Sequence, residues 1–99
     1  MLGAYMIQSY KDSKVERLYE GVNIRIWTPM RRQAEKRLRI LDAADRLETL
    51  MLLPSNRFEA LHGDRKGQYS IRINERWRLC FTWPSGAPGP GDVEIVDYH

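Results

Sequence analysis

A chain of 99 residues, 42% apolar and 29% charged, has room for one small hydrophobic core, and its composition excludes a largely disordered protein. Its single cysteine, Cys80, excludes a disulfide framework, and no run approaches the roughly 18 apolar residues that a membrane span needs. We therefore expect one cytoplasmic domain, residues 1–99, that does not cross a membrane. Within it, residues 1–5 are candidates for an N-terminal extension in front of Met6.

The net charge of +3 hides an uneven distribution. All 16 Lys and Arg residues lie at or before Arg78, and the charged side chains of the last 21 residues are Asp and Glu. A basic body with an acidic final segment favours a polyanionic partner, with nucleic acid first. Solvated helix faces are the alternative explanation of the same charges.

The N-terminal half of the chain predicts a short strand and then helices. Residues 6–10 lean apolar and are interpreted as an edge strand. Asp12 or Ser13 is suited to cap a first helix, which Gly21 ends.

A longer helix is predicted to begin at Thr28-Pro29, an N-cap hydroxyl followed by proline, and to run to about Ala44. Its buried stripe is predicted to consist of Ala34, Leu38, Leu41 and Ala44. Cations fill the rest of this helix: Arg31, Arg32, Lys36, Arg37 and Arg39. Asp45 is interpreted as the cap of a short helix that runs through Leu52.

Two alternating runs, residues 68–74 and 77–83, predict a β-hairpin with one buried face. An even loop would put their apolar side chains on opposite faces of the hairpin. The odd loop 74–76 instead brings Ile71 opposite Leu79 on one face, so we expect this register.

The same register places Arg72 directly opposite Arg78 on the other face, which we expect to be exposed to solvent. Like charges at such positions destabilise a sheet. Their juxtaposition is easier to understand if an anion lies between them, and phosphate is the obvious candidate.

Two further strands complete the predicted sheet. One is residues 57–61, before the hairpin, and the other is residues 93–98, after a loop rich in proline and glycine at 84–92. Helices followed by mainly antiparallel strands indicate an α+β fold, with the helices packed on one face of the sheet.

Several acid–base and cationic side chains fall on strands that can be neighbours. The acid–base candidates are Glu59, His62, Asp97, Tyr98 and His99. The cationic candidates are Arg65, Lys66, Arg72 and Arg78. RNA cleavage without a metal requires a base for the 2′-hydroxyl, cations for the phosphorane and an acid for the leaving oxygen. A frayed C-terminus and solvated surface side chains are the alternative explanation of these residues.

Metal and cofactor signatures are weak. His62, His99 and Cys80 lack the spacing of metal ligands. Residues 63–67 lack the length and the Lys-Ser/Thr ending of a phosphate-binding loop. We therefore expect no cofactor and no metal.

The chain resembles the HigB-like toxins of the RelE/ParE superfamily of bacterial toxin–antitoxin systems. The resemblance rests on residues 65–74 (RKGQYSIRIN), 77–81 (WRLCF) and 93–99 (VEIVDYH), and residues 6–10, 53–54 and 57–61 fit the same pattern. It implies a RelE-like fold with N-terminal helices on a small, mainly antiparallel sheet. It also implies a ribosome-dependent endonuclease that cleaves mRNA in the ribosomal A site, inhibited by a cognate antitoxin with a helix-turn-helix domain.

Carried over residue by residue, the resemblance implies a catalytic C-terminus formed by Asp97, Tyr98 and His99. It implies phosphate-facing cations at Arg65, Lys66, Arg72 and Arg78. Two positions depart from the family pattern: Glu59 stands where some members have a catalytic histidine, and His62 stands where lysine is usual. Which of Glu59 and His62 replaces that histidine stays open. The rival functions are a ParE-like, non-catalytic toxin that binds gyrase and a non-catalytic RNA-binding module.

Overall fold

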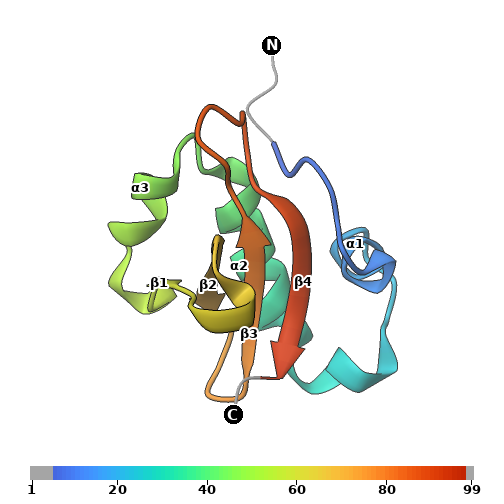
Figure 1. Cartoon of the computed structure of the whole chain (residues 1–99). Helices are drawn as coiled ribbons and strands as arrows, with labels where there is room; N and C mark the ends of the chain where they lie inside the picture. The colour runs from blue at the N-terminus through green and yellow to red at the C-terminus, as the bar shows by residue number, and fades with distance from the viewer. Residues whose placement is uncertain (1–5, 98–99) are drawn as a thin grey trace.

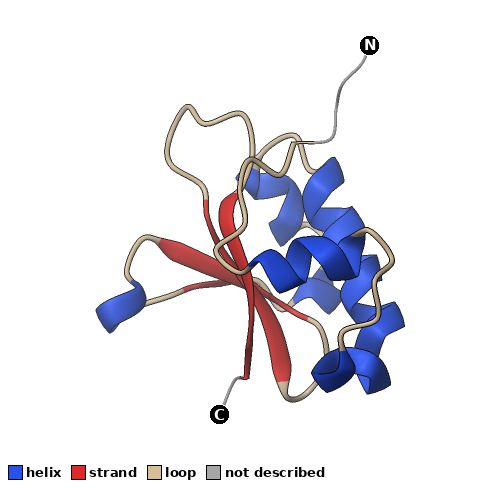
Figure 2. Cartoon of the chain, turned by 90° about the vertical axis from the view of Figure 1, so that its right-hand side faces the viewer, coloured by secondary structure: helices blue, strands red, loops and turns tan. Residues whose placement is uncertain are grey.

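The computed structural model describes residues 6–97, in which helices precede a four-stranded antiparallel sheet (Figure 1). The helices are α1 (Ser13–Tyr19), α2 (Arg31–Ala43) and α3 (Leu47–Met51), with 3₁₀ turns η1 (Arg25–Met30), η2 (Pro54–Asn56) and η3 (Gly63–Arg65). The strands are β1 (Glu59–Ala60), β2 (Gln68–Arg72), β3 (Trp77–Thr82) and β4 (Gly91–Asp97), in the spatial order β1-β2-β3-β4. Apart from the short turn η3, the helices gather on one side of the sheet, which confirms the α+β prediction (Figure 2).

Helix α1 begins and ends as its sequence predicts. The carboxylate of Asp12 accepts a hydrogen bond from the backbone N–H of Lys14 at 2.9 Å, which satisfies a donor that the first turn leaves without a partner. The helix ends before Gly21, whose φ of +101° lies in the region that favours glycine.

The predicted start of α2 is wrong by two residues, because the N-cap is Met30 rather than Thr28. Thr28 and Pro29 belong to η1, and the Thr28 hydroxyl donates to the Asn23 side-chain oxygen at 2.8 Å instead of capping the helix. Turn η1 buries Trp27 and Met30 in the core, so tertiary packing overrides the local start signal. The predicted stripe is confirmed, because all four of its residues are buried: Ala34, Leu38, Leu41 and Ala44.

Three other local predictions are corrected. Asp45 does not cap α3: its carboxylate accepts from the hydroxyl of Thr49, and α3 ends at Met51. Residues 6–10 form no regular strand but run beside β4, with a single parallel bridge from Tyr10 to Val93. Strand β1 has two residues rather than five, since only Glu59 and Ala60 pair with β2.

The hairpin register is confirmed. Ile71 lies opposite Leu79, and Arg72 lies opposite Arg78. The side chain of Asn74 closes the loop, because its oxygen accepts from the backbone N–H groups of residues 76 and 77 at 2.9 and 2.8 Å. Ile71 and Leu79 are both fully buried, and they belong to the same hydrophobic cluster as Leu38 and Leu41 of α2.

The prediction that Arg78 faces solvent is wrong. It has the expected register position, on the side of the sheet away from Leu79, but the residue is only 7% exposed. Segment 57–60 covers it and supplies a backbone carbonyl and a carboxylate to its guanidinium. Arg72, its cross-strand neighbour, is partly exposed.

A second polar contact joins the helical layer to the N-terminal segment. Asp42 of α2 accepts from the Tyr19 hydroxyl at 2.9 Å and from the Ile7 backbone N–H at 3.0 Å. Burial, followed by the hydrogen bond to Asp42, raises the pKa of Tyr19, and burial raises the pKa of Tyr10 to about 12. Both phenols therefore hold their protons more tightly in the folded chain than in the unfolded one.

We expect Tyr19→Phe to lower the free energy of unfolding by about 1–2 kcal/mol at pH 7, because Asp42 loses a hydrogen-bond donor. Since the folded pKa is raised, the stability from this phenol is complete below its unfolded pKa, about 10, and is lost as pH rises through the folded pKa. Urea unfolding at pH 7 and at several values above pH 10 should show a shallower alkaline loss in the variant. Parallel curves for the two proteins would contradict the linkage to Tyr19.

Candidate nucleic-acid interface

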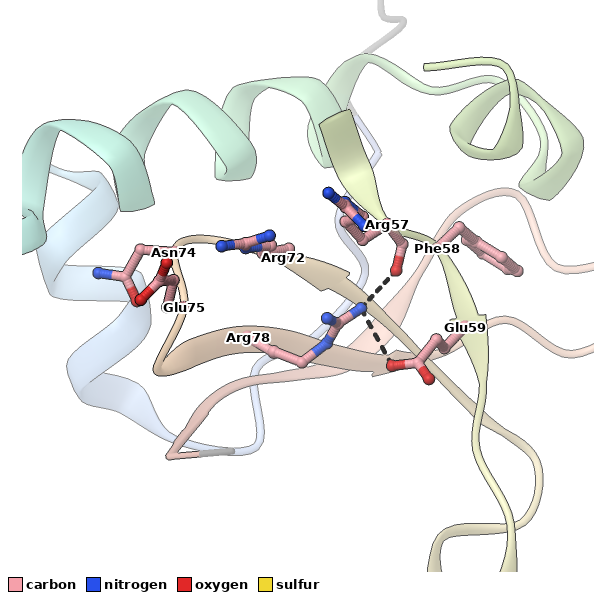
Figure 3. A pocket seen from close by; sticks show the side chains of 7 residues that line it. All are labelled: Arg57, Phe58, Glu59, Arg72, Asn74, Glu75 and Arg78. Atoms are coloured by element: carbon pink, nitrogen blue, oxygen red, sulfur yellow. Dashed lines mark hydrogen bonds and ion pairs between the residues drawn. The ribbon is translucent and has the colours of Figure 1, made fainter. Parts of the chain in front are cut away.

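A hollow of about 510 Å³ lies between segment 57–59 and the β2–β3 hairpin (Figure 3). We call it the Arg78 hollow. Its lining consists of Arg57, Phe58, Glu59, Arg72, Asn74, Glu75 and Arg78. Three of these side chains are guanidinium groups and two are carboxylates, so the hollow suits a ligand that carries negative charge.

Ser70, Arg57 and Glu59 help to hold Arg78 in one orientation. Its Nε donates to the Ser70 hydroxyl at 2.8 Å, and its Nη2 donates to the backbone carbonyl of Arg57. The same Nη2 lies 3.4 Å from Oε1 of Glu59 (Figure 3). Ser70 is paired with Glu59 on β1, and its small side chain leaves Arg78 room to reach diagonally across β2. The result is a rigid, oriented cation beside a carboxylate that is 47% exposed.

Arg57 owes its place in the hollow to an uncommon backbone conformation. It follows turn η2 with φ of +47°, a left-handed value that few non-glycine residues adopt. Such conformations persist where the surroundings determine them and concentrate at functional sites. Here the turn directs the carbonyl of Arg57 to Arg78 and leaves the residue exposed at the hollow.

A smaller hollow of about 300 Å³, the Cys80 hollow, adjoins the first because Glu59 lines both. It also contains His62 and Arg65. Arg65 donates to Glu94 at 3.0 Å, and this hydrogen bond raises the pKa of the guanidinium. Burial raises the pKa of the Cys80 thiol, so it stays protonated at neutral pH and is a poor nucleophile.

The sequence of the chain matches known proteins along nearly its whole length. Residues 8–99 match the family described as HigB-like toxin, the RelE-like toxin of the type II toxin–antitoxin system HigB. The chain is also 39% identical over 83 residues to Toxin HigB-1 of Vibrio cholerae serotype O1 (strain ATCC 39315 / El Tor Inaba N16961). The matched stretch covers 82% of this chain and 87% of the relative. The chain belongs to the HigB-like toxin family.

Membership confirms the resemblance found in the sequence. This HigB-like toxin is a toxin of a type II toxin–antitoxin system, and the ParE-like alternative is not favoured. A toxin of this type implies a cognate antitoxin as its partner.

The HigB-like fold brings together some of the predicted site residues and separates others. Glu59, Arg72 and Arg78 meet in the Arg78 hollow, while His62 and Arg65 line the Cys80 hollow with Glu59. The remaining predicted residues do not line either hollow within the described part of the chain: Lys66 is exposed in the turn after η3, Asp97 ends β4, and Tyr98 and His99 lie outside the described residues.

Asp97 has a different neighbourhood from Glu59 and His62. It is paired with Trp77 across the β3–β4 ladder, on the side of the sheet opposite Arg78. Its carboxylate accepts from Nη2 and Nε of Arg76 at 2.8 and 3.0 Å. The Arg76 guanidinium also lies 4.7 Å from the ring centre of its neighbour Trp77. The hydrogen bonds from Arg76 to Asp97 hold the hairpin loop against the end of β4.

The sequence interpretation missed two arginines. Arg37 was assigned to the solvated face of α2, yet it donates to the side-chain oxygen of Asn56 at 2.8 Å. Arg57 was assigned to a strand, but in the structure it follows turn η2 and has a positive φ. Turn chemistry around Pro54 was the available signal, because proline often begins such turns.

Within residues 6–97, no three His, Cys, Asp or Glu side chains are grouped so that they could hold a metal ion. No helix of the same range is long and apolar enough to span a bilayer.

Proposed function

We propose that this HigB-like toxin is a ribosome-dependent endonuclease that cleaves mRNA in the ribosomal A site, in the cytoplasm. The observation that carries the proposal is the contact between Arg78 and Glu59 in a hollow lined by two more arginines. A carboxylate and an oriented cation side by side are what the attack of a 2′-hydroxyl on the next phosphate requires.

In the proposed reaction, Glu59 takes the proton of the 2′-hydroxyl as the 2′-oxygen attacks phosphorus. Arg78 donates hydrogen bonds to the phosphoryl oxygens, whose negative charge increases in the phosphorane. Arg72 and Arg57 face the same hollow and add positive charge. The bond to the 5′-oxygen then breaks, leaving a 2′,3′-cyclic phosphate and a 5′-hydroxyl. Positive charge comes from guanidinium groups of the toxin, so the proposal needs no metal ion.

The acid that protonates the leaving 5′-oxygen is assigned from the family resemblance to Tyr98 or His99. Asp97 is assigned a positioning role, because its contact with Arg76 ties the hairpin loop to the end of β4. Arg65, balanced by Glu94, and the exposed Lys66 are assigned to longer-range attraction of RNA.

Dependence on the ribosome follows from the openness of the site. Glu59 is about half exposed and residues 6–97 leave the hollow open, so a free message would rarely adopt the in-line geometry. A ribosome that holds the A-site codon in a fixed conformation would supply this orientation, which is worth several orders of magnitude in rate.

The test is cleavage of end-labelled mRNA on purified ribosomes that carry a defined A-site codon, read by primer extension. We expect cuts within the A-site codon, 2′,3′-cyclic phosphate ends and no cuts in the same mRNA without ribosomes. Intact mRNA together with inhibited DNA gyrase would instead support the ParE-like function. Intact mRNA with normal gyrase activity and retained RNA binding would support the RNA-binding module.

A further inference from the structure

A third hollow, of about 410 Å³, lies between α2 and the hairpin and extends the Arg78 hollow. We call it the Arg37 hollow. The two adjoin because they share Arg57, Arg72, Asn74 and Glu75. Unlike the Arg78 hollow, the Arg37 hollow reaches α2, where Gln33 and Arg37 line it.

The arginines of the Arg37 hollow differ from Arg65 and Arg78 because no carboxylate of the described residues forms an ion pair with them. Among residues 6–97, no carboxylate lies within 4.0 Å of the guanidinium groups of Arg37, Arg57 or Arg72. Arg65 and Arg78, by contrast, contact Glu94 and Glu59. Glu75 also lines both hollows but forms no ion pair with these three arginines within the described residues. The three cations therefore repel one another, and an anion bound between them would relieve this repulsion.

Burial and the positive charge of Arg72 both affect the pKa of Arg37. Burial lowers the pKa of this guanidinium, and the nearby charge of Arg72 lowers it further. An anion bound between the two side chains would reverse the second effect, since an opposite charge favours the protonated form.

Arg37 is also fixed in place by its neighbours. Its Nη1 donates to the Asn56 side-chain oxygen at 2.8 Å and to the Ser55 hydroxyl at 3.3 Å. Asn56 is fully buried, and its amide donates to the Leu50 carbonyl at 3.0 Å. Within the described residues, the other guanidinium donors of Arg37 make no hydrogen bond, so an oriented fork remains for a ligand.

We propose that the Arg37 hollow binds a backbone phosphate of the mRNA next to the phosphate that is cleaved. This inference rests on the proposed endonuclease function and names a second contact to the same substrate. Two adjoining basic hollows match the regular succession of phosphates along one RNA strand. Ser55, Gln33 and Asn74 at the rim offer hydrogen bonds to the sugar hydroxyl groups.

The first experiment measures binding without cleavage. A trinucleotide with 2′-O-methyl groups, which cannot be cut, is titrated into the isotope-labelled toxin while the side-chain Nε–H signals of the arginines are followed by NMR. We expect saturable shifts of the Arg37 and Arg72 signals that disappear at high salt. An unchanged Arg37 signal, while the Arg78 signal shifts, overturns the proposal and leaves the endonuclease function standing.

The second experiment uses mRNA in which a neutral methylphosphonate replaces one phosphate at a time around the A-site codon. For the wild type, we expect one position other than the cut site to raise KM by roughly tenfold with little change in kcat. Arg37→Gln should show a similarly raised KM on unmodified mRNA and no further effect of that methylphosphonate. The matched control is Arg39→Gln, which removes the same charge from an exposed position of α2 that lines none of the three hollows.

Each outcome decides between the alternatives. Equal methylphosphonate effects in the wild type and Arg37→Gln, or equal KM changes in the Arg37 and Arg39 variants, overturn the proposal. A wild-type protein that cuts no mRNA at all refutes the endonuclease function, and the titration with the uncleavable trinucleotide then decides the hollow by itself. Shifts of Arg37 caused by an acidic antitoxin peptide, with none caused by the trinucleotide, would assign the hollow to the partner protein and overturn the proposal.

Discussion

Arg78→Ala is expected to slow mRNA cleavage on the ribosome by about 10²–10³-fold, while ribosome binding changes little. In the proposed reaction, Arg78 stabilises the phosphorane, and its contacts with Ser70, Arg57 and Glu59 fix the orientation of its guanidinium. Charge of this kind acts mainly in the transition state, so the loss should appear in kcat. Single-turnover cleavage with toxin in excess over programmed ribosomes measures this rate directly.

Two companion variants separate this role from simpler explanations. Arg78→Lys keeps the charge but has no planar fork to reach all three acceptors, so we expect most of the loss to remain. Arg17→Ala removes an exposed arginine from α1 and should leave the rate within a few-fold of wild type. Thermal melting of each variant reports whether the fold is retained. A folded Arg78→Ala protein with wild-type cleavage would remove Arg78 from the mechanism.

Glu59→Gln is expected to lower the cleavage rate by about 10²–10⁴-fold, the usual contribution of a general base. The amide keeps the shape of the side chain and an oxygen for Arg78, but it cannot take the proton of the 2′-hydroxyl at neutral pH. The structural cost should therefore be small, and the low-pH limb of the wild-type pH–rate profile should disappear. Single-turnover rates over a range of pH, at saturating toxin, give both readouts.

His62→Gln is the matched control for this second prediction, because His62 lines the Cys80 hollow but not the Arg78 hollow. We expect its cleavage rate to stay within a few-fold of wild type. The opposite pattern, a large loss at position 62 and a small one at position 59, would assign the base to His62. It would also move the reaction to the Cys80 hollow. The pair of variants thus decides which of the two residues takes the place of the histidine found in some relatives.

The hairpin shows how much of the fold can be predicted from local sequence. Alternation with an odd loop leaves one register that buries both apolar sets, and the structure has this register from Ile71 opposite Leu79 to Arg72 opposite Arg78. The cap at Asp12 and the buried stripe of α2 were equally readable, because caps and 3.6-residue periodicity depend on neighbours in sequence. Family motifs added the toxin identity, which the comparisons confirmed.

Predictions failed where packing against residues distant in sequence determines the backbone conformation. Thr28-Pro29 is a good helix start, yet burying Trp27 and Met30 holds these residues in a 3₁₀ turn. Strand β4 begins at Gly91 rather than at residue 93, and its ladder with β3 is interrupted by a bulge at Asp92, whose φ is +48°. Propensity is a weak guide at such positions, because tertiary packing contributes more free energy than the local preference.

The sequence by itself determined the family, the fold class and the hairpin register, and it supplied the residues of the candidate site, because each follows from contacts or motifs within a short stretch of chain. Only the tertiary structure decided which of those residues meet. It buried Arg78 under segment 57–60, paired it with Glu59, and placed Asp97 on the other side of the sheet beside Arg76. It also brought Arg37 of α2 to the edge of the hairpin. These placements depend on how β1 pairs with β2 and how α2 packs against the sheet, a long-range arrangement that no local pattern encodes.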